Sequence, residues 1–432
     1  MSEAGSVDTS LPTTEAGRIE SLDVLRGFAL LGILLLNIIG FGMLSPSYSN
    51  PGFDLAGASA INVSSWIVVE LFAEGAMRCL FSILFGAGVV LFTDTKSGWV
   101  HYRRTFWLLM FGLFNAYILL WSGDILVTYA LAGAVLYLAR NRSAKALIMI
   151  AGVLIILMSL LHAVTAYGLG EAEKAQQRVL AAEANGDESQ RVDQEAALAW
   201  QEFTGDFELD DAGAKAEIAA RTDSYSSVFS WTADQNAGVY AFVLPIFLFW
   251  DALAMMILGM ALYKTGVLQA ARSRAFYIKL TIAGFGLGLI FNAYEAYRAL
   301  SSDFAVMSTF AQMQPTYHFG RLSVAVGYIG LLCLICRSDV LQAFTTRLAL
   351  VGRMALTNYL MQSLICAVIF TGLGFGLLGD WQRIELYGVV IAIWAFQIWL
   401  SAFWLQRYRL GPLEWVWRAL TYGSAPSIKR AP

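Results

Sequence analysis

Residues 18–44 read RIESLDVLRGFALLGILLLNIIGFGML, and this stretch decides the fold. From Gly27 onward every residue except Asn37 is apolar or glycine. A helix needs about 20 such residues to cross the hydrocarbon core of a bilayer, so this stretch predicts a membrane span. Asp23 and Arg26 lie at its start. Because charges are costly inside a membrane, the few that occur there indicate where function should be sought.

The composition of the whole chain supports the same interpretation. Of its 432 residues 58% are hydrophobic and only 14% are charged, whereas soluble domains contain about 25% charged residues. We therefore expect an all-α, polytopic membrane protein with about ten transmembrane helices. The apolar windows lie near residues 22–44, 76–93, 103–120, 123–140, 145–168, 238–263, 275–297, 318–337, 350–378 and 384–405.

The distribution of basic residues predicts the orientation. Lys and Arg concentrate in alternate loops and in the C-terminal tail, whereas the short loops of the opposite side contain only Arg298 and Arg383. Because cytoplasmic loops carry the excess of Lys and Arg, both termini are expected in the cytoplasm, N-in and C-in. The polar N-terminal residues lack the basic region and cleavage site of a signal peptide, so we expect the first helix to remain as an anchor.

Four segments follow from this topology: a first five-span half (1–168), a polar insertion (169–237), a second five-span half (238–405) and a cytoplasmic tail (406–432). The insertion contains fifteen Asp or Glu and five Lys or Arg, and it falls on the extracytoplasmic side. Its Ala, Glu and Gln content suggests two helices joined by a turn near Gly186. It is either a solvated spacer or a lid or docking surface for an extracytoplasmic substrate.

The segment 411–423, GPLEWVWRALTYG, predicts a short helix that begins at Pro412. Its Trp and Tyr residues are typical of the membrane interface, so we expect the helix to lie on the cytoplasmic surface of the membrane.

Polar residues within or beside the predicted spans form two groups by depth. The inner group is Asp23, Arg26, Arg103, Arg104 and Arg353, and the outer group is Glu70, Glu74, Arg78, Trp121, Asp124, Asn292, Glu295, His318 and Arg321. Glu70, Glu74 and Arg78 are spaced i, i+4 and i+8, so they share one helical face. Ionisable groups from separate helices at one depth suggest a polar cavity open to the outer face. The alternative is structural, with Glu74–Arg78 or Glu295–Arg321 ion pairs locking helices together.

His318 is the only histidine of the outer group, and a histidine can take and return a proton near neutral pH. His162 is isolated among apolar residues and is interpreted as structural or incidental. Asp251 lies near the middle of its span, where an unpaired carboxylate would suit proton or cation coupling. The sequence contains no phosphate-binding glycine loop, metal-ligand cluster or nucleophile elbow.

Four stretches resemble the YeiB-like family of bacterial inner-membrane proteins, whose function is unknown: SLDVLRGFALLGILLLN (21–37), EGAMRCLFSILFGAGV (74–89), WSGDILVTYALAG (121–133), and GRMALTNYLMQSLI (352–365) with the closing GPLEW segment. The opening Leu-Asp-x-x-Arg-Gly pattern is also similar to that of membrane acyltransferases, including the enzyme that acetylates heparan glucosamine. That resemblance implies an acyl-CoA donor on the cytoplasmic side and an acceptor on the other side. It also implies that Asp23 and Arg26 shape a central cavity or cofactor path, that the basic loops attract CoA phosphates, and that Glu74, Arg78 and Asp124 line the acceptor side.

The leading functional hypothesis is therefore transfer of an acyl group from a cytoplasmic acyl-CoA-type donor to an extracytoplasmic sugar, lipid or envelope acceptor. The candidate catalytic residues are His318, Glu295, Glu74, Arg78, Asp124 and Arg321, and the candidate cofactor-binding residues are Asp23, Arg26, Arg103, Arg104 and Arg353. His318 would act as the base, with Glu295 or Glu74 orienting it and Arg78 or Arg321 stabilising the charge on the acyl carbonyl. We expect no metal and no tightly bound cofactor, with acyl-CoA as a co-substrate.

The expected partners are the lipid bilayer of the bacterial inner membrane and a small-molecule, glycan or lipid substrate, without nucleic acid. The oligomeric state stays open. One alternative function is secondary transport of a small charged solute, in which Asp251, Glu295 and Arg321 would bind the solute and a coupling ion. The other is a non-catalytic scaffold, in which the outer charges would pair off and leave no open cavity.

Overall fold

The computed structural model describes residues 19–53, 59–205, 207–310 and 314–429. Every named element in these residues is a helix, and the one β-type pairing among them is an isolated bridge between Tyr408 and Lys429. The predicted all-α class is confirmed. The ends of the first and last predicted segments, residues 1–18 and 430–432, lie outside the described residues.

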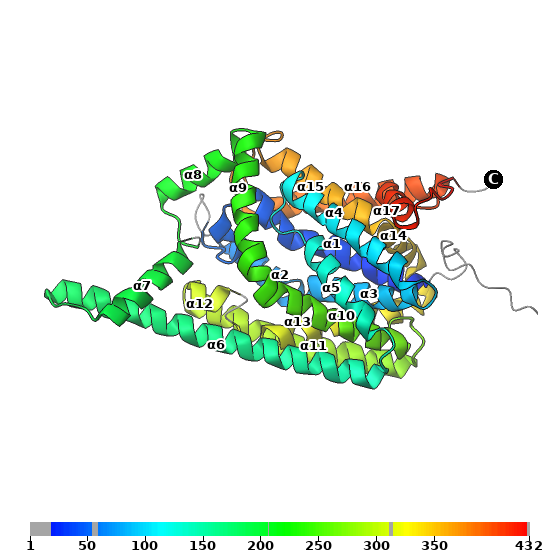
Figure 1. The fold of residues 1–432 in the computed structure, drawn as a ribbon, viewed down its shortest axis with the longest axis horizontal. Coiled ribbons are helices and arrows are strands. Elements are labelled where there is room, and N and C mark those ends of the chain that lie inside the picture. Colours follow the sequence, from blue (N-terminus) through cyan, green and yellow to red (C-terminus); the bar gives the residue numbers. More distant parts are fainter. Residues whose placement is uncertain (1–18, 54–58, 206, 311–313, 430–432) are drawn as a thin grey trace, which may run out of the picture.

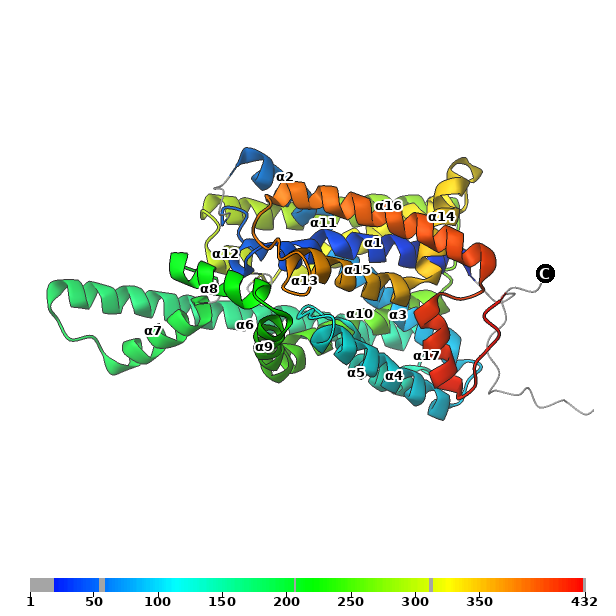
Figure 2. The ribbon, with the colours of Figure 1, turned by 90° about the horizontal axis from the view of Figure 1, so that it is seen from above.

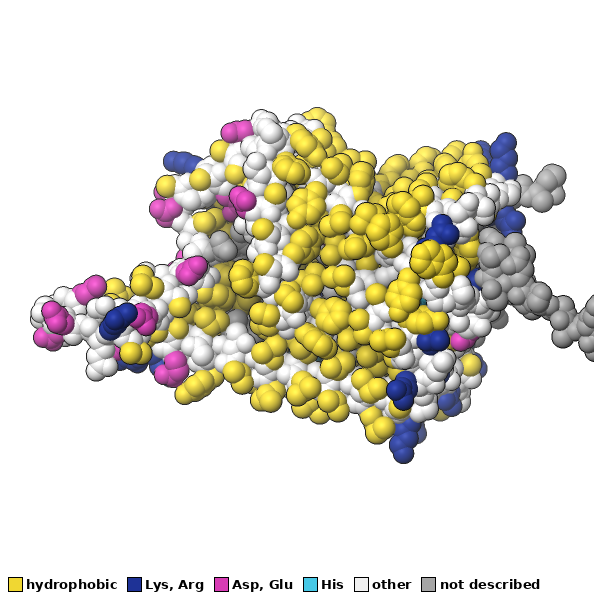
Figure 3. All heavy atoms as spheres, in the orientation of Figure 1, with side chains coloured by type: hydrophobic (Ala, Val, Ile, Leu, Met, Phe, Trp, Pro, Cys, Tyr) yellow, Lys and Arg dark blue, Asp and Glu magenta, His cyan; other side chains and the backbone are white. Residues whose placement is uncertain are grey.

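The molecule is an elongated helical bundle (Figures 1 and 2). One end carries the helices of the insertion, and we call it the insertion end. The other end carries α17 (Pro412–Tyr422) and the described C-terminus, and we call it the α17 end. On the face shown in Figure 3, acidic side chains gather at the insertion end and basic ones at the α17 end, with a hydrophobic surface between them. The positive-inside rule therefore predicts that the α17 end is cytoplasmic.

Seven helices in the described part of the chain are long and apolar enough to span a membrane. They are α1 (Glu20–Gly42), α2 with α3 (Ala60–Phe72 and Ala76–Thr93), α6 (Ala144–Asn185), α9 through η3 to α10 (Tyr225–Gly238, Val239–Leu248 and Phe249–Lys264), α11 (Arg274–Ser301), α13 (Tyr317–Cys336) and α16 (Arg383–Arg407). An eighth arises if α14 (Gln342–Arg353) and α15 (Ala355–Phe370), which meet at an angle of 79°, form one broken span.

The predicted number of ten spans is larger than this count. The two additional windows do form helices, α4 (Gly98–Tyr117) and α5 (Leu126–Ala139). However, α5 has only 14 residues, and α4 contains His101, Arg103 and Arg104. A 14-residue helix is about 21 Å long at 1.5 Å per residue, which is shorter than the hydrocarbon core.

Shorter elements connect the long helices, namely η2 (Ser45–Tyr48), α12 (Val306–Thr309) and η5 (Asp339–Leu341). The segment η3 is a π-helix with Pro245 inside it. Proline lacks the N–H that an α-helix needs and its ring crowds the preceding turn, so a wider turn accommodates it without ending the helix.

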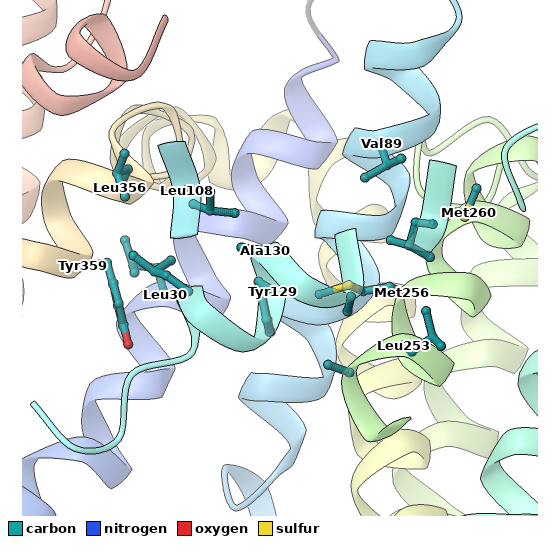
Figure 4. Packing of buried hydrophobic residues seen from close by; sticks show 14 of the residues in the cluster. Leu30, Val89, Leu108, Tyr129, Ala130, Leu253, Met256, Met260, Leu356 and Tyr359 are labelled. Carbon is teal, nitrogen blue, oxygen red and sulfur yellow. The ribbon is translucent and has the colours of Figure 1, made fainter. Parts of the chain in front are cut away.

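The two predicted five-span halves share one core. Figure 4 shows Leu30 of α1, Tyr129 of α5, Met256 of α10 and Tyr359 of α15 converging in the same hydrophobic cluster. Glycines permit the closest helix crossings. A Cβ atom on Gly27 would collide with the Leu348 carbonyl of α14, so the glycine of the Leu-Asp-x-x-Arg-Gly pattern serves the packing of α1 on α14.

The insertion is built differently from the expected pair of helices. α6 continues without a break past residue 168 to Asn185, and Gly186 (φ +75°) ends it in the left-handed conformation that glycine adopts readily. α7 (Arg191–Thr204) then packs back on the extension of α6, with Arg178 bonded to Asp193. This bond lowers the pKa of Asp193. α8 (Asp211–Thr222) follows, and α9 lies within the predicted insertion but begins the long helix that continues through η3 into α10. The turn at Gly186 is therefore as expected, but residues 169–237 contain more than two helices.

α8 attaches the insertion to the end of α1. Arg221 of α8 donates to the carbonyls of Gly40 (2.7 Å), Phe41 (3.2 Å) and Met43 (3.0 Å), which are among those that a helix C-terminus leaves unsatisfied. Glu217 pairs with Arg221 (2.8 Å) and accepts a hydrogen bond from the Ser45 N–H (3.1 Å). Burial lowers the pKa of Arg221, and the Glu217 carboxylate opposes this effect. At α8 the insertion is therefore a docked element, not a freely solvated spacer.

At the other end of the molecule, α17 is attached to the start of α15. Its Glu414 carboxylate accepts hydrogen bonds from the backbone N–H groups of Leu356 (2.7 Å) and Thr357 (3.1 Å) and from the Thr357 hydroxyl (2.6 Å). These groups lie at the start of α15, just after the 79° bend. Burial raises the pKa of Glu414, and the bonds from Thr357 counteract that rise. The GPLEW segment therefore caps a broken helix in addition to covering the end of the bundle.

Candidate functional site

The helix expected to carry Glu70, Glu74 and Arg78 on one face is broken at residues 73–75, so Glu74 lies in the break and Arg78 lies in the following helix. α2 ends at Phe72, α3 begins at Ala76, and Gly75 between them has φ +62°. A Cβ atom on Gly75 would collide with side-chain atoms of Arg321 and Tyr317, so glycine is required both for the turn and for the contact. The N-terminus of α3 has no side-chain cap, and its partial positive charge lies beside Arg78.

Five residues from α3, α10 and α13 form the centre of the site, which we call the Arg321 cluster: Arg78, Asp251, Tyr317, His318 and Arg321. Arg321 contacts both carboxylate oxygens of Asp251, with 3.0 Å between Nη1 and Oδ2. Asp251 Oδ2 is also 4.0 Å from Arg78 Nη2, and Oδ1 is 3.5 Å from His318 Nδ1. Asp251 is therefore the shared counter-charge of the cluster, which corrects the expectation of an unpaired carboxylate.

His318 has a defined hydrogen-bonding state in this arrangement. Its Nδ1 lies 2.7 Å from Arg321 Nη2. A guanidinium only donates, so Nδ1 accepts and the neutral ring carries its proton on Nε2. His318 Nε2 is buried and has no partner among the described residues. The carboxylate beside the ring is Asp251, so neither Glu295 nor Glu74 occupies the orienting position expected of them.

The glutamates form a rim next to the cluster. Tyr317 Oη donates to Glu74 Oε1 (3.2 Å) and accepts from Arg78 Nη2 (3.2 Å), so Tyr317 connects these two charges. Glu295 accepts a hydrogen bond from the Thr316 hydroxyl. Glu70, Glu74 and Glu295 are close enough to interact electrostatically. We call these three residues the acidic rim.

Asn292 supports the rim from α11. Its side-chain amide donates to the carbonyl of Leu71 (3.0 Å), near the end of α2. Asn292 thereby holds α2, the helix that carries Glu70, and positions the backbone at the break between α2 and α3.

Accessibility increases from the cluster towards the insertion end. The side chain of Arg321 is 1% exposed and that of His318 is 2% exposed, whereas Arg78 keeps 33% of its surface accessible. Tyr48, which follows α1 beside the docked α8 and interacts electrostatically with Glu74 and Arg78, is 47% exposed. Tyr48 and Arg78 therefore keep part of their side-chain surface accessible, whereas His318 and Arg321 are buried.

His162 belongs to this site although its sequence context indicated an incidental residue. Its ring centroid lies 4.5 Å from that of His318, and the residue is only 3% exposed. The ring is hydrogen-bonded to the backbone of Gln314, and its Nδ1 has no partner among the described residues. Sequence reasoning missed this contact because nothing in the chain indicates that α6 and α13 are neighbours.

Asp124 and Trp121 lie apart from the Arg321 cluster. Asp124 accepts hydrogen bonds from the Asn115 amide (2.8 Å) and from the Val127 N–H (2.9 Å), so it caps the start of α5. Trp121 stacks on Phe41 at 3.9 Å between ring centroids. Their environment is that of structural residues between α4 and α5.

The residues of the inner group lie near the α17 end, but they do not all form one cluster. Arg104 lies over the rings of Trp417 (4.6 Å) and Phe92 (4.9 Å), and the charges closest to it include Arg26 and Arg418. We call Arg26, Arg104 and Arg418 the Arg104 cluster. Among the described residues, Asp23 pairs with Arg26 (3.0 Å).

The other two inner arginines bind backbone carbonyls elsewhere. Arg103 donates to Leu420 (2.9 Å) and Arg353 to Arg409 (3.4 Å). The described residues contain no group of three or more His, Cys, Asp or Glu side chains suited to a metal ion.

Comparisons with known proteins find a family model and full-length bacterial relatives. A family model described as "Protein of unknown function (DUF418)" matches residues 262–424. The chain is 29% identical over 412 residues to the uncharacterized protein YeiB of Escherichia coli (strain K12), covering 95% of this chain and 98% of that protein. It is 30% identical over 435 residues to the uncharacterized protein YxaH of Bacillus subtilis (strain 168), covering 97% and 98%. No solved structure matches the chain at a significant level.

Proposed function

Because this chain belongs to the YeiB-like, DUF418 family of membrane proteins of unknown function, we propose its activity from the chemistry of its own polar residues. The proposed activity is acyl transfer from a cytoplasmic acyl-CoA-type donor to a sugar, lipid or envelope acceptor at the insertion end. The protein would act in the bacterial inner membrane with its α17 end in the cytoplasm. The observation that carries this proposal is the Arg321 cluster, which combines a buried histidine, a carboxylate beside it and two arginines at a helix break.

The cluster supplies the groups that acyl transfer needs. In the arrangement described above Nδ1 accepts from Arg321 and Nε2 carries the proton, so base catalysis requires Arg321 to release Nδ1. With its proton on Nδ1, facing Asp251 Oδ1 at 3.5 Å, His318 would have its Nε2 lone pair available to take the proton of the acceptor hydroxyl. The acceptor oxygen then bonds to the thioester carbon, the carbon–sulfur bond breaks, and the departing thiolate receives the proton. Arg78, Tyr317 and the positive end of α3 lie together where they would stabilise the negative charge on the carbonyl oxygen. The products are the acylated acceptor and free CoA.

The Arg104 cluster supports a donor site at the α17 end. Arg104 and two further arginines lie near one another with Asp23 as the adjacent carboxylate, an arrangement that favours a polyanionic ligand such as the phosphates of CoA. Phe85 and Phe92, which lie beneath Arg104, are 7 and 14 residues along α3 from Arg78. These intervals correspond to about 10 and 21 Å of helix. A nucleotide thioester bound at the Arg104 cluster would need an extended arm of about this length to reach Arg78.

A second candidate function is secondary transport, and the break at Gly75 favours it. Transporters often bind an anionic solute at the N-terminus of a discontinuous helix. Here Arg78 and the uncapped start of α3 lie at such a break. In that function the acidic rim would bind the coupling proton or cation.

Donor binding separates these two candidates. Purified protein in nanodiscs would be titrated with acetyl-CoA, longer acyl-CoAs and free CoA while its thermal unfolding is followed. A ligand that binds only the folded state adds about 2.7 kcal/mol at a hundred-fold excess over its Kd, so acyl-CoA is expected to raise the melting temperature. Arg104→Gln should weaken binding about ten-fold or more, because it removes charge-assisted contacts.

Arg347→Gln is the matched control, since Arg347 is an exposed arginine of α14 outside the Arg104 cluster. It should leave the response unchanged. If folded wild-type protein shows no response to any acyl-CoA, the acyltransferase proposal fails and transport becomes the better account.

A further inference from the structure

An apolar groove lies between α4, α15 and α17. Its volume is about 470 Å³, which lies in the range of small-molecule sites. Its walls include Trp107, Phe114, Leu360, Leu364 and Val416. The hydroxyl of Thr357 already bonds to Glu414 and to the Leu413 N–H, and the other polar side-chain group of the described lining is the indole N–H of Trp107. The described lining is therefore almost entirely apolar and suits a hydrocarbon chain.

The groove, taken together with Arg103 one turn before its lining on α4, has about the length of one membrane leaflet. Arg103, Trp107, Phe111 and Phe114 follow one face of α4. The rise from Arg103 to Phe114 is about 16 Å at 1.5 Å per residue. Half of a hydrocarbon core of about 30 Å is about 15 Å, so the groove would extend from the membrane surface to the bilayer centre. Exposed Trp99 and Tyr102 precede it on α4, as aromatic residues do at an interface.

Basic side chains stand at the surface end of the groove. Arg103 donates to the carbonyl of Leu420, a residue that lines the groove. Lys96 lies over the ring of Tyr422, 5.9 Å from its centroid, at the end of the same helix. The one carboxylate of α17, Glu414, is bonded to the start of α15. Arg103 and Lys96 therefore place two positive charges at this end of the groove, and these charges complement an anionic group.

We propose that this groove binds one acyl chain of an anionic phospholipid from the leaflet at the α17 end, with its phosphate group against Arg103 and Lys96. The apolar lining would contact the acyl chain, and the basic residues would bind the anionic headgroup. A lipid reaches the groove laterally from the bilayer, so no opening of the bundle is needed. The bound lipid would hold α17 against α4 and α15, and this role is independent of the proposed acyl transfer.

The test measures bound lipid and stability in two bilayers. The protein would be placed in nanodiscs of phosphatidylcholine alone or mixed with dioleoyl phosphatidylglycerol, and lipid retained after gentle extraction would be identified by native mass spectrometry. We expect retained phosphatidylglycerol and a higher melting temperature in the mixed nanodiscs. Arg103→Gln should weaken retention about five-fold, the factor that corresponds to about 1 kcal/mol for one basic residue at an anionic surface. Arg103→Lys should retain the preference.

A second variant tests the chain-binding part of the groove. Met361→Trp would fill the groove and should abolish retention, whereas Leu138→Trp, at a 72% exposed position on α5, should not. Equal retention of phosphatidylcholine and phosphatidylglycerol would overturn the proposal, as would full retention by Met361→Trp. Displacement of the lipid by acyl-CoA would overturn it in favour of a donor chain in the groove.

Discussion

At the scale of single residues, Asp251 is the position on which the Arg321 cluster depends. Its carboxylate faces Arg321, His318 and Arg78. Asp251 lies on α10 and its partners lie on α3 and α13, so their positions in the sequence do not indicate that they are in contact. A buried arginine without its counter-charge is strongly destabilising, whereas removing both partners is tolerated much better. The ion pair therefore controls both the stability of the fold at this depth and the orientation of His318.

Asp251→Asn and Arg321→Gln should each destabilise the protein by about 3–5 kcal/mol, because each leaves a buried partner unpaired. The double variant should be destabilised by clearly less than the sum. Equilibrium unfolding in mixed micelles would measure this coupling. Additive effects of the two substitutions would contradict the pairing.

Much of this site was predictable from the sequence by residue type and depth. The outer group contained Glu70, Glu74, Arg78, Glu295, His318 and Arg321, and these residues do lie in the Arg321 cluster and the acidic rim. Helical periodicity reports which residues share a face of one helix, but it does not report which helices are neighbours. For that reason the partnership of Asp251 with Arg321 and the approach of His162 to His318 were not predicted.

At the scale of elements, the two ends of the bundle are fastened by charged side chains that bind backbone groups at helix termini. Arg221 of α8 binds carbonyls at the end of α1, and Glu414 of α17 binds N–H groups at the start of α15. Both contacts satisfy backbone N–H or C=O groups that have no hydrogen-bond partner within their own helix. In each contact the side chain carries the charge that the helix dipole favours at that terminus. Neither was foreseeable, because each joins segments far apart in the sequence.

Arg221→Ala should release the insertion without unfolding the bundle. It removes three bonds to α1 and leaves Glu217 buried without its cation, so amide hydrogen exchange should accelerate in residues 40–48 and 211–222. Arg191→Ala is the matched control, since its pair with Glu195 is largely exposed and contributes little. Unchanged exchange at residues 40–48 in Arg221→Ala would show that α8 does not hold the end of α1.

Element boundaries were predicted well where apolar runs are long and poorly where helices break. The window at 22–44 coincides closely with α1, whereas the window at 350–378 covers two helices that meet at 79°. The break follows Arg353, and no proline or glycine stands at the junction itself. The Glu414 cap, supplied from another helix, stabilises it.

At the scale of the whole molecule, the orientation in the membrane decides which substrates reach which cluster. The acidic insertion end and the basic α17 end are separated by the hydrophobic surface seen in Figure 3. The positive-inside rule predicts the α17 end in the cytoplasm. The Arg104 cluster would then face cytoplasmic donors, and the acidic rim would face extracytoplasmic acceptors.

Cysteine labelling tests this orientation directly. Val192 of α7 is 73% exposed and Ser424 after α17 is also exposed, so Cys at either position should react with maleimide. In a Cys336→Ser background, where the remaining cysteines are buried, a membrane-impermeant maleimide should label Val192→Cys in intact cells. It should label Ser424→Cys only after permeabilisation. The reverse pattern would place the Arg104 cluster outside the cell and remove its access to acyl-CoA.

Label transfer in sealed inside-out vesicles tests whether the Arg321 cluster transfers acyl groups across the membrane. Radiolabelled acetyl-CoA is supplied on the α17 side, and label is counted in the lipid and glycan fractions of the lumen. The account predicts incorporation with the wild-type protein and a loss of about 10²–10⁴-fold in His318→Gln, the usual effect of removing a general base. Arg78→Gln should also lose incorporation, and Arg191→Gln should retain it. Incorporation that persists in both His318→Gln and Arg78→Gln, or that is absent with folded wild-type protein, would contradict the account.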